Sequence, residues 1–341
     1  MHPEGGDLCN ALTAASWYEN RTMVRLLLDR GADVNNRDGL ALQSVSWRGG
    51  TEVMQLLLDA GADVNAQGGR FGNALQAASL AGHNQIVRLL LDKGGGVNAR
   101  GGRHGDALQA ASLEGFREIA EMLLDKGADV RASGGEFSEA VLAAAYFGND
   151  PMIEILLESY ADLDARDDVG RNAFSWAAIG GNDITFDILL KKRARKGDCS
   201  TLDLLKVADK LGRSTIHHFA MGRSLEGVEL VLHAGVDVDV PDAQGWTALH
   251  WSEFCNSEAV MSLLLSRGAR PDLTDLQGRN ASCASEAVGA TLLTSLLRDT
   301  ADCEASERCD IMDCTPIIAQ CNCCRRVSCG IENLETMKPH T

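Results

Sequence analysis

Aromatic side chains and long hydrophobic runs are scarce in this chain. Phe, Trp and Tyr make up only 5% of its 341 residues, whereas hydrophobic residues together reach 45%. Abundant Leu, Ala and Gly favour a core of thin, closely stacked layers. No apolar run reaches the roughly 18 residues that a transmembrane helix needs, and the N-terminus lacks the basic segment and apolar stretch of a secretory signal. We therefore expect an intracellular, cytoplasmic protein that does not enter a membrane.

Basic residues are also in short supply. The 32 Lys and Arg residues are outnumbered by 48 Asp and Glu residues, which leaves a formal net charge of −16. Phosphate groups and anionic lipids attract proteins through a basic face. This balance argues against direct binding to nucleic acid or to an anionic membrane.

Recognisable catalytic motifs are missing as well. The chain has no Gly-x-Ser-x-Gly elbow, no His-Glu-x-x-His helix and no Gly-Lys-Ser/Thr loop that would cradle phosphate. The sequence therefore predicts a protein that is not an enzyme. Turnover of any substrate by the purified chain would overturn this prediction.

The cysteines do not suggest a disulfide framework. Their total of 11 is odd, and seven of them lie between Cys303 and Cys329. An intracellular protein keeps its thiols reduced, so the C-terminal cluster requires a separate explanation.

A regular repeat is the strongest feature that the sequence does have. A short motif that reads Asn10-Ala11-Leu12 in its first copy occurs eight times, at spacings of 30, 33, 33, 33, 33, 42 and 33 residues. A second block, Gly31-Ala32-Asp33-Val34-Asn35, follows the same period. A period near 33 with two short helices per unit is typical of a stacked solenoid. We predict an all-α solenoid that offers a binding surface rather than a catalytic pocket. The third residue of the motif is Leu12, Leu42, Leu75, Leu108, Val141, Phe174, Ile216 and Leu249.

The third copy shows how one unit is built. A polar, glycine-rich finger precedes Asn73, which can cap the helix that follows. The pattern predicts a first helix over 74–80 and a second over 86–91, ended by Gly94 in the left-handed conformation of a C-cap. The fifth unit has Tyr160 at that position, which we expect to cost about 1–2 kcal/mol.

Individual copies also carry a family signature. The eighth copy reads Thr247-Ala248-Leu249-His250 and the seventh Ser214-Thr215-Ile216-His217, close to Thr-Pro-Leu-His. Units three and four read Gly-Gly-Arg-x-Gly-Asn/Asp-Ala-Leu-Gln-Ala-Ala-Ser. These units resemble ankyrin repeats, and the second type is similar to the ankyrin arrays of filamentous fungi. The resemblance covers roughly residues 5–302, as about eight units and a degenerate ninth. It implies protein–protein interaction without indicating a partner.

The period is broken in two places, which suggests the domain organisation. The second unit is three residues short at Arg37 to Gly39, which predicts a tight turn in place of a finger, and nine extra residues fall around 191–206. We therefore divide the chain into ankyrin repeats 1–6 at residues 1–190, a basic interrupted linker at 191–207, repeats 7–9 at 208–302 and a Cys-rich tail at 303–341.

The linker contains a basic run of Lys191, Lys192, Arg193, Arg195 and Lys196. An exposed strip of this kind is typical of a nuclear-import signal. Cations also favour the C-terminal end of a solvated helix, which is the alternative interpretation. The localisation of a reporter fused to the run, and of a chain with the run neutralised, would distinguish them.

In the ankyrin family, the two residues after the small Ala/Ser stretch of the first helix face the concave groove. Carried onto this sequence, the first residue of each pair is apolar, which suggests a hydrophobic stripe. Trp, Tyr and Arg, which are common at interface hot spots, are concentrated in the first two units. The alternative is that these side chains only cover adjacent helices. The candidate partner-binding residues are Trp17, Tyr18, Trp47, Arg48, Leu80, Leu113, Glu114, Tyr146, Phe147, Ile179, Met221 and Phe254.

The tips of the fingers form a second candidate surface. Their mixed character fits specificity at a rim better than affinity, and the alternative for each residue is an ordinary solvated turn. These residues are Arg70, Phe71, Arg103, His104, Glu136 and Phe137.

The Cys-rich tail suggests a metal site. Cys309, Cys314, Cys321 and Cys324 lie at short spacings, and thiolates bind zinc at ~2.3 Å. The segment weakly resembles the start of a ZZ-type zinc finger, which would make a structural zinc ion the only cofactor, although the family's second ligand would fall at Met312. The alternative is a disordered tail without metal. Measurement of zinc release on thiol modification would distinguish a zinc site from a tail without metal.

The sequence favours a monomeric, non-enzymatic scaffold or adaptor that binds a partner protein in the groove of an ankyrin solenoid. The alternative is a nuclear transcription coregulator of a fungal pathway. It would use the basic run for entry and act through protein partners, because the acidic array lacks the basic face that reads DNA. The subcellular localisation of the chain would distinguish the adaptor from the nuclear coregulator.

Overall fold

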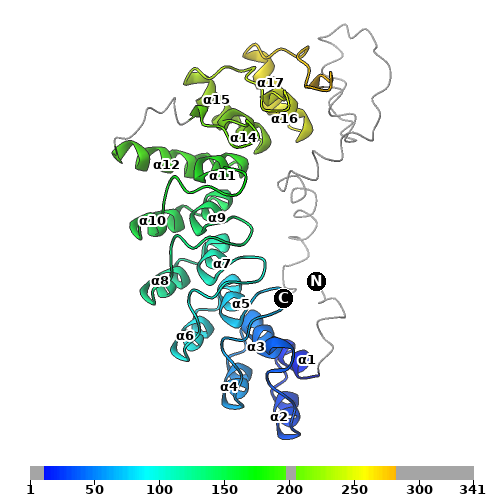
Figure 1. Cartoon of the computed structure of the whole chain (residues 1–341), viewed down its shortest axis with the longest axis vertical. Coiled ribbons are helices and arrows are strands. Elements are labelled where there is room, and N and C mark those ends of the chain that lie inside the picture. Colours follow the sequence, from blue (N-terminus) through cyan, green and yellow to red (C-terminus); the bar gives the residue numbers. More distant parts are fainter. Residues whose placement is uncertain (1–10, 197–204, 282–341) are drawn as a thin grey trace. The chain divides into compact units, whose positions relative to one another are not determined.

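The computed structural model describes residues 11–196 and 205–281. The chain divides into two compact units, with the boundary between Asp168 and Val169. In both units the described residues form pairs of short α-helices, and only isolated β-bridges occur between them (Figure 1). The prediction of an all-α repeat fold is therefore confirmed.

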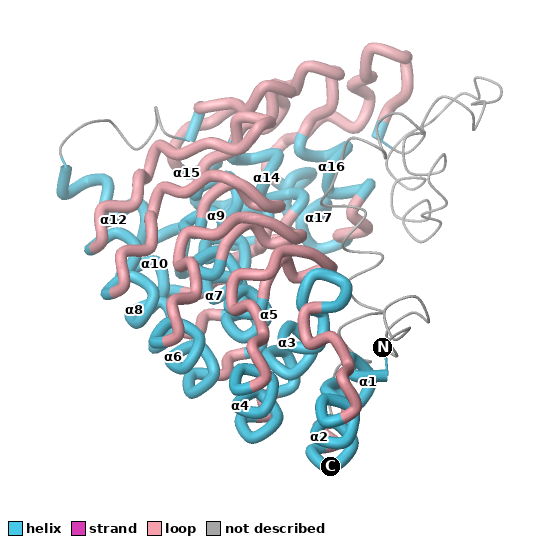
Figure 2. Tube along the Cα trace, turned by 60° about the horizontal axis from the view of Figure 1, so that its bottom comes forward, coloured by secondary structure: helices cyan, strands magenta, loops and turns pink. Residues whose placement is uncertain are grey.

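Residues 11–168 of the N-terminal unit form five helix pairs, and the two helices of a pair differ in position. The first helix of each pair belongs to an inner row and the second to an outer row, and loops join one pair to the next (Figures 1 and 2). The inner helices are α1 (Ala11–Trp17), α3 (Asn36–Arg48), α5 (Ala74–Ala81), α7 (Ala107–Glu114) and α9 (Ala140–Phe147). The outer helices are α2 (Arg21–Asp29), α4 (Thr51–Asp59), α6 (Asn84–Asp92), α8 (Arg117–Asp125) and α10 (Asp150–Glu158).

The C-terminal unit repeats the same arrangement of helix pairs. Its inner helices are α11 (Ala173–Ile179), α14 (Thr215–Met221) and α16 (Ala248–Phe254). Its outer helices are α12 (Asp183–Lys196), α15 (Leu225–His233) and α17 (Glu258–Ser266).

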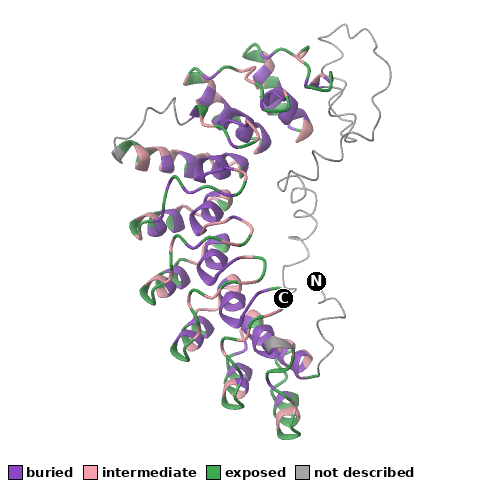
Figure 3. Ribbon diagram, in the orientation of Figure 1, coloured by how far each residue is buried: buried purple, intermediate pink, exposed green. Residues whose placement is uncertain are grey.

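The inner helices are buried because their side chains are small. Ala77, Ala78 and Ser79 of α5 have no exposed surface, and Ala110, Ala111 and Ser112 of α7 repeat the pattern. The ribbon of the inner helices is accordingly mostly coloured as buried in Figure 3. The outer helices bury only one face, which carries Ile86, Val87 and Leu90 in α6. A helix of two turns is marginal alone in water, so stacking on its neighbours supplies most of its stability.

The predicted caps are present at both ends of the helices. The side chain of Asn73 accepts a hydrogen bond from the backbone N–H of Gln76 at 2.8 Å, and Asp106 does the same for Gln109. Gly94 follows the second helix with φ of +86°. The sequence pattern therefore predicted the local geometry of the third unit correctly.

Buried glutamines join the inner helices α5 and α7 to the finger of the next repeat. Gln76 Nε2 donates to the carbonyl oxygen of Gly105 at 2.7 Å, and Gln109 Nε2 donates to that of Ser138 at 3.0 Å one repeat later. In the C-terminal unit this position is His217, whose Nε2 lies 3.0 Å from the carbonyl oxygen of Val240. Gln in one repeat type and His in the other therefore perform the same task.

The Asn of the Gly-Ala-Asp-Val-Asn block ties consecutive loops together. Asn65 Nδ2 donates to the carbonyl oxygen of Gly94 at 3.1 Å, and its Oδ1 accepts from the N–H of Gly96 at 2.7 Å. Asn35 and Asn98 make the corresponding pairs of bonds to the loops that follow them. This ladder of amides explains why the block repeats with the helices.

One expectation about the breaks in the period needs correction, and it does not concern the short second unit. Helix α3 begins at Asn36, but Gly39 within its first turn has a left-handed φ of +72°, which a regular helix does not adopt. The backbone therefore turns at the position where the short unit was expected to turn. The basic run, assigned above to a linker, instead continues helix α12 to Lys196, and Lys191 forms an ion pair with Asp187.

Tyr160 has the left-handed backbone conformation that the sequence led us to expect. Its φ is +68° at the position where the preceding repeats have Gly94 and Gly127. Its side chain is 80% exposed, so no packing compensates for the strain. We expect Tyr160→Gly to raise the free energy of unfolding by about 1 kcal/mol, because the strain of ~1–2 kcal/mol exceeds the entropy that glycine adds to the unfolded chain.

Chemical denaturation would measure this effect. Gly94→Tyr is the reverse control, since a Cβ at Gly94 meets nothing within 4 Å, and it should lose a similar amount. Equal stability of all three chains would contradict the prediction.

Candidate protein-binding surface

Aromatic rings and guanidinium groups lie together at the ends of the first inner helices. The guanidinium carbon of Arg48 lies 5.8 Å from the ring centroid of Trp17. In the next repeat the ring of Trp47 stacks on Phe71 with centroids 4.8 Å apart, and Arg70 covers the same Phe71 ring at 4.9 Å. Such contacts combine a large apolar area with a cation that can turn to a partner.

A second aromatic group occupies the end of α9. The ring centroids of Tyr146 and Phe147 are 4.9 Å apart, and Phe137 of the preceding finger lies 5.4 Å from Tyr146 and 5.8 Å from Phe147. Phe147 is 46% exposed, as Tyr18 is 62% exposed at the end of α1. The N-terminal unit thus presents large rings to solvent at two of its inner helix ends.

The predicted hydrophobic stripe is not continuous. Of the apolar first residues in each pair, Leu113, Ile179 and Met221 are 7% exposed, so they are buried. Trp47 of the same column is half-buried, and its ring stacks on Phe71 of the next finger.

In the N-terminal unit the second residue is the more accessible one in four of the five pairs. Tyr18, Arg48, Glu114 and Phe147 are all exposed, while Trp17, Trp47, Leu80 and Tyr146 are half-buried. Partial desolvation raises the pKa of Glu114 above its ordinary value. These residues, rather than the apolar column, form the accessible part of the predicted surface.

The finger tips also differ from the sequence-based expectation. Phe71 and Phe137 are buried, at 7% and 4% exposure, because they fold back onto inner helices. Arg70 and Arg103 are exposed, and Arg103 pairs with Glu136 at 3.2 Å. His104 is half-buried. The finger surface is therefore made by the arginines and not by the phenylalanines.

The C-terminal unit contains a buried polar network that the sequence analysis missed. Arg213 pairs with Asp209 at 2.7 Å with both side chains almost fully buried, and Arg279 pairs with Asp275 in the same way. Each carboxylate also accepts backbone N–H groups within its own turn. The signal is visible as Asp-x-x-Gly-Arg at both places. This motif stabilises the finger in repeats whose finger does not contain the Gly-Gly sequence.

The buried histidines have structural roles. The backbone N–H of Ser214 donates to His217 Nδ1 at 3.0 Å, so Nδ1 is unprotonated and the ring proton on Nε2 faces the carbonyl of Val240. His250 repeats this capping box with Thr247. Burial lowers the pKa values of His217 and His250, which keeps both rings neutral.

Both repeat types now point to one family. The family of Ankyrin repeats (3 copies) matches residues 40–133 and 193–275, and the single Ankyrin repeat matches residues 7–39. The chain belongs to the ankyrin repeat family. Among solved structures it is similar to the human ASB11 ankyrin repeat domain, with a TM-score of 0.54 and 22% identity over 67% of this chain and 98% of that chain. No curated protein matches the chain.

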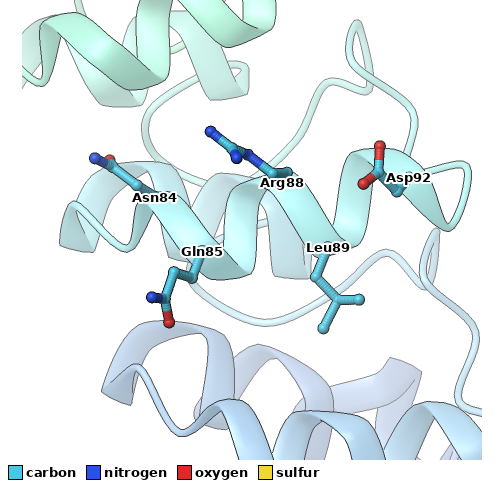
Figure 4. Close-up of a pocket in the computed structure, with 5 residues that line it drawn as sticks. All are labelled: Asn84, Gln85, Arg88, Leu89 and Asp92. Carbon is cyan, nitrogen blue, oxygen red and sulfur yellow. The ribbon is translucent and has the colours of Figure 1, made fainter.

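Ankyrin repeats are generally protein–protein interaction modules and typically have no enzymatic activity. A 340 Å³ depression on the outer helix α6 is lined by Asn84, Gln85, Arg88, Leu89 and Asp92 (Figure 4). Figure 4 shows that these side chains project in different directions from one helix, and none is a nucleophile beside a base. The residues of this depression therefore do not indicate a catalytic site on α6.

Two further predictions concern metal and membrane. Within residues 11–196 and 205–281, no group of three or more His, Cys, Asp or Glu side chains could hold a metal ion. The predicted zinc ligands Cys309, Cys314, Cys321 and Cys324 lie outside the described residues. The helices that the structure describes are all too short or too polar to cross a membrane.

The buried ionisable groups predict opposite effects of pH on the two units. Burial lowers the pKa of His218 to about 4, below the ~6.5 of an unfolded histidine. The unfolded state therefore binds more protons between these values, and the C-terminal unit loses stability as pH falls from about 6.5 to 4. The raised pKa of Asp183 offsets part of this loss. In the N-terminal unit burial raises the pKa of Asp106 to about 6 and that of Glu139 to about 7, so its stability increases as pH falls through these values.

Hydrogen exchange at pH 7 and pH 5, corrected for intrinsic rates, would resolve the two units. We expect protection to fall in α14 and to rise in α7. Parallel changes in both helices would contradict the assignment.

Proposed function

We propose that this chain is a non-enzymatic adaptor that captures a partner protein on the surface formed by the inner helix ends and fingers of residues 11–168. The observation that carries the proposal is the pair of exposed rings, Tyr18 and Phe147. Tyr is enriched at interface hot spots and Phe is enriched in interfaces. The exposed arginines Arg48 and Arg70 lie over the rings of Trp17 and Phe71 and supply the polar rim that such interfaces need.

The proposal is tested with variants that do not remove core residues. The double variant Tyr18→Ala, Phe147→Ala should lose at least about tenfold in affinity for a partner identified by affinity purification and mass spectrometry, since each hot-spot ring contributes roughly 1–2 kcal/mol or more. Its thermal midpoint should stay close to that of the original chain, because both rings are exposed. Ile184→Ala, which removes an exposed side chain from an outer helix, is the matched control. Full affinity of the double variant would remove the basis for this surface.

A second candidate function is that of a nuclear coregulator that acts through protein partners. The basic run at the end of α12 supports it, because the Lys191 side chain is 68% exposed in spite of its ion pair with Asp187. Replacement of Lys191, Lys192 and Arg193 by Gln should then move the chain from nucleus to cytoplasm. An unchanged distribution would leave the basic run as the solvated end of a helix. We propose a cytoplasmic location for the adaptor, and a zinc ion in the tail stays a prediction.

A further inference from the structure

The outer helix α2, at the end of the row beyond α4 (Figure 1), is less buried at Met23 and Leu27 than every other outer helix of the N-terminal unit is at the same positions. Met23 is the third residue of its helix and is 43% exposed. The equivalent residues are 2% exposed or less, namely Val53, Ile86, Ile119 and Met152. Leu26 is 44% exposed, and Leu27 is half-buried where its equivalents are fully buried. The stacking face of the first repeat is therefore uncovered among the described residues.

The ion pairs between outer helices show what this face is shaped to accept. Lys126, at the C-terminal end of α8, pairs with Asp92 in the last turn of α6 at 3.5 Å. Arg30 is the equivalent C-terminal residue of α2, is exposed, and has no carboxylate of the described residues within ion-pair distance. Arg30 therefore lies where a carboxylate in the last turn of a helix stacked on α2 would meet it.

The direction of such a helix follows from the same contacts. At the N-terminal ends, Arg21 of α2 pairs with Glu52 of α4 at 2.8 Å, and Asn84 of α6 bonds to Glu118 of α8. The N-terminal ends of consecutive outer helices therefore lie beside each other, as do their C-terminal ends, so these helices run parallel. A helix that continues this row on α2 also runs parallel to it.

A second copy of α2 is a poor match for the face. The helix and its cap carry Arg21, Arg25 and Arg30 with a single carboxylate, Asp29. A two-fold contact between two such faces would bring arginines together. An acidic helix avoids this repulsion.

We propose that the face formed by Met23, Leu26, Leu27 and Arg30 docks an amphipathic helix of a partner protein. That helix runs parallel to α2, places aliphatic side chains on Met23 and Leu26, and carries an Asp or Glu in its last turn that pairs with Arg30. This docking surface is separate from the rings at the inner helix ends.

The test uses the full chain and a stapled, fluorescent peptide with the sequence of α6, Asn84–Asp92. The staple is needed because a nine-residue helix is marginal in water, and the peptide carries both the aliphatic face and the terminal Asp. We expect saturable binding in fluorescence polarisation. Met23→Glu with Leu26→Glu should weaken it at least about tenfold, since two buried aliphatic contacts are lost. Ile184→Glu is the control and should bind like the original chain.

A charge reversal makes the test specific for geometry. Arg30→Glu should weaken binding about three- to tenfold, and a peptide with Arg in place of its terminal Asp should restore affinity for this variant. Tyr18→Ala with Phe147→Ala should leave peptide binding unchanged, so failure here is distinguishable from failure of the proposed adaptor surface. Absence of saturable binding, equal binding by all variants, or self-association of the chain that Leu26→Glu abolishes would each overturn the proposal.

Discussion

Gly102→Ala is expected to destabilise the N-terminal unit by about 3 kcal/mol. Gly102 has φ of +62°, which costs an alanine roughly 1 kcal/mol. A Cβ there would also lie 2.5 Å from the backbone carbon of Phe71 and 2.6 Å from the nitrogen of Gly72. Those are backbone atoms of the neighbouring finger and cannot rotate away, so overpacking adds about 1–3 kcal/mol.

The matched control is Gly94→Ala in the preceding repeat. Gly94 has φ of +86°, but a Cβ there would meet nothing within 4 Å. We expect a loss of only about 1 kcal/mol in chemical denaturation. Equal losses in the two variants would mean that the fingers of consecutive repeats do not stack as closely as the structure shows.

Arg213→Leu should destabilise the C-terminal unit by about 3–5 kcal/mol, because it leaves a buried carboxylate without its cation. Burial alone raises the pKa of Asp209, but His218 and Arg213 outweigh it and hold that pKa well below its usual range. Arg213 contributes to the low pKa of His218, so its removal lets His218, whose Nε2 lies 3.4 Å from the carboxylate, take up a proton at a higher pH. The loss should therefore be smaller at pH 5 than at pH 8, since protonated His218 replaces part of the lost charge.

The double variant Arg213→Leu, Asp209→Asn provides the control for charge. The side-chain amide oxygen that this variant has at position 209 can still accept the backbone N–H groups of the turn, and no buried carboxylate is left without a cation. The double variant should be more stable than Arg213→Leu at pH 8. Urea denaturation at both pH values, followed by the fluorescence of Trp251 and its neighbours, measures these differences. A pH-independent loss would contradict the role given to His218.

Local features of the repeat could be predicted from the sequence because they depend on residues within one unit. Asn73 caps the helix that begins at the next residue, and Gly94 adopts the left-handed conformation just past the second helix. Tyr160 was expected to be strained on the same reasoning, and its φ of +68° agrees. Caps and turns involve neighbours within about four residues, so a sequence pattern is sufficient for them.

The candidate surface was harder to predict because its exposure depends on contacts between repeats. Leu80 and Leu113 occupy the same position of consecutive repeats, yet Leu80 is half-buried and Leu113 is buried. Such a difference comes from contacts with other repeats, of which the stacking of Phe71 on Trp47 is an example. The position of a finger over the preceding helix cannot be deduced from the period alone.

The sequence by itself determined the family, the helical repeat and the caps, because spacing and residue type act over one or two helical turns. Only the tertiary structure decided that Phe71 and Phe137 are buried, that the basic run continues α12, and that Met23 and Leu26 of the first repeat are uncovered. The physical reason is that burial belongs to a pair of neighbouring repeats and not to a single one. A residue with the same place in the period is core or surface according to what is stacked on it.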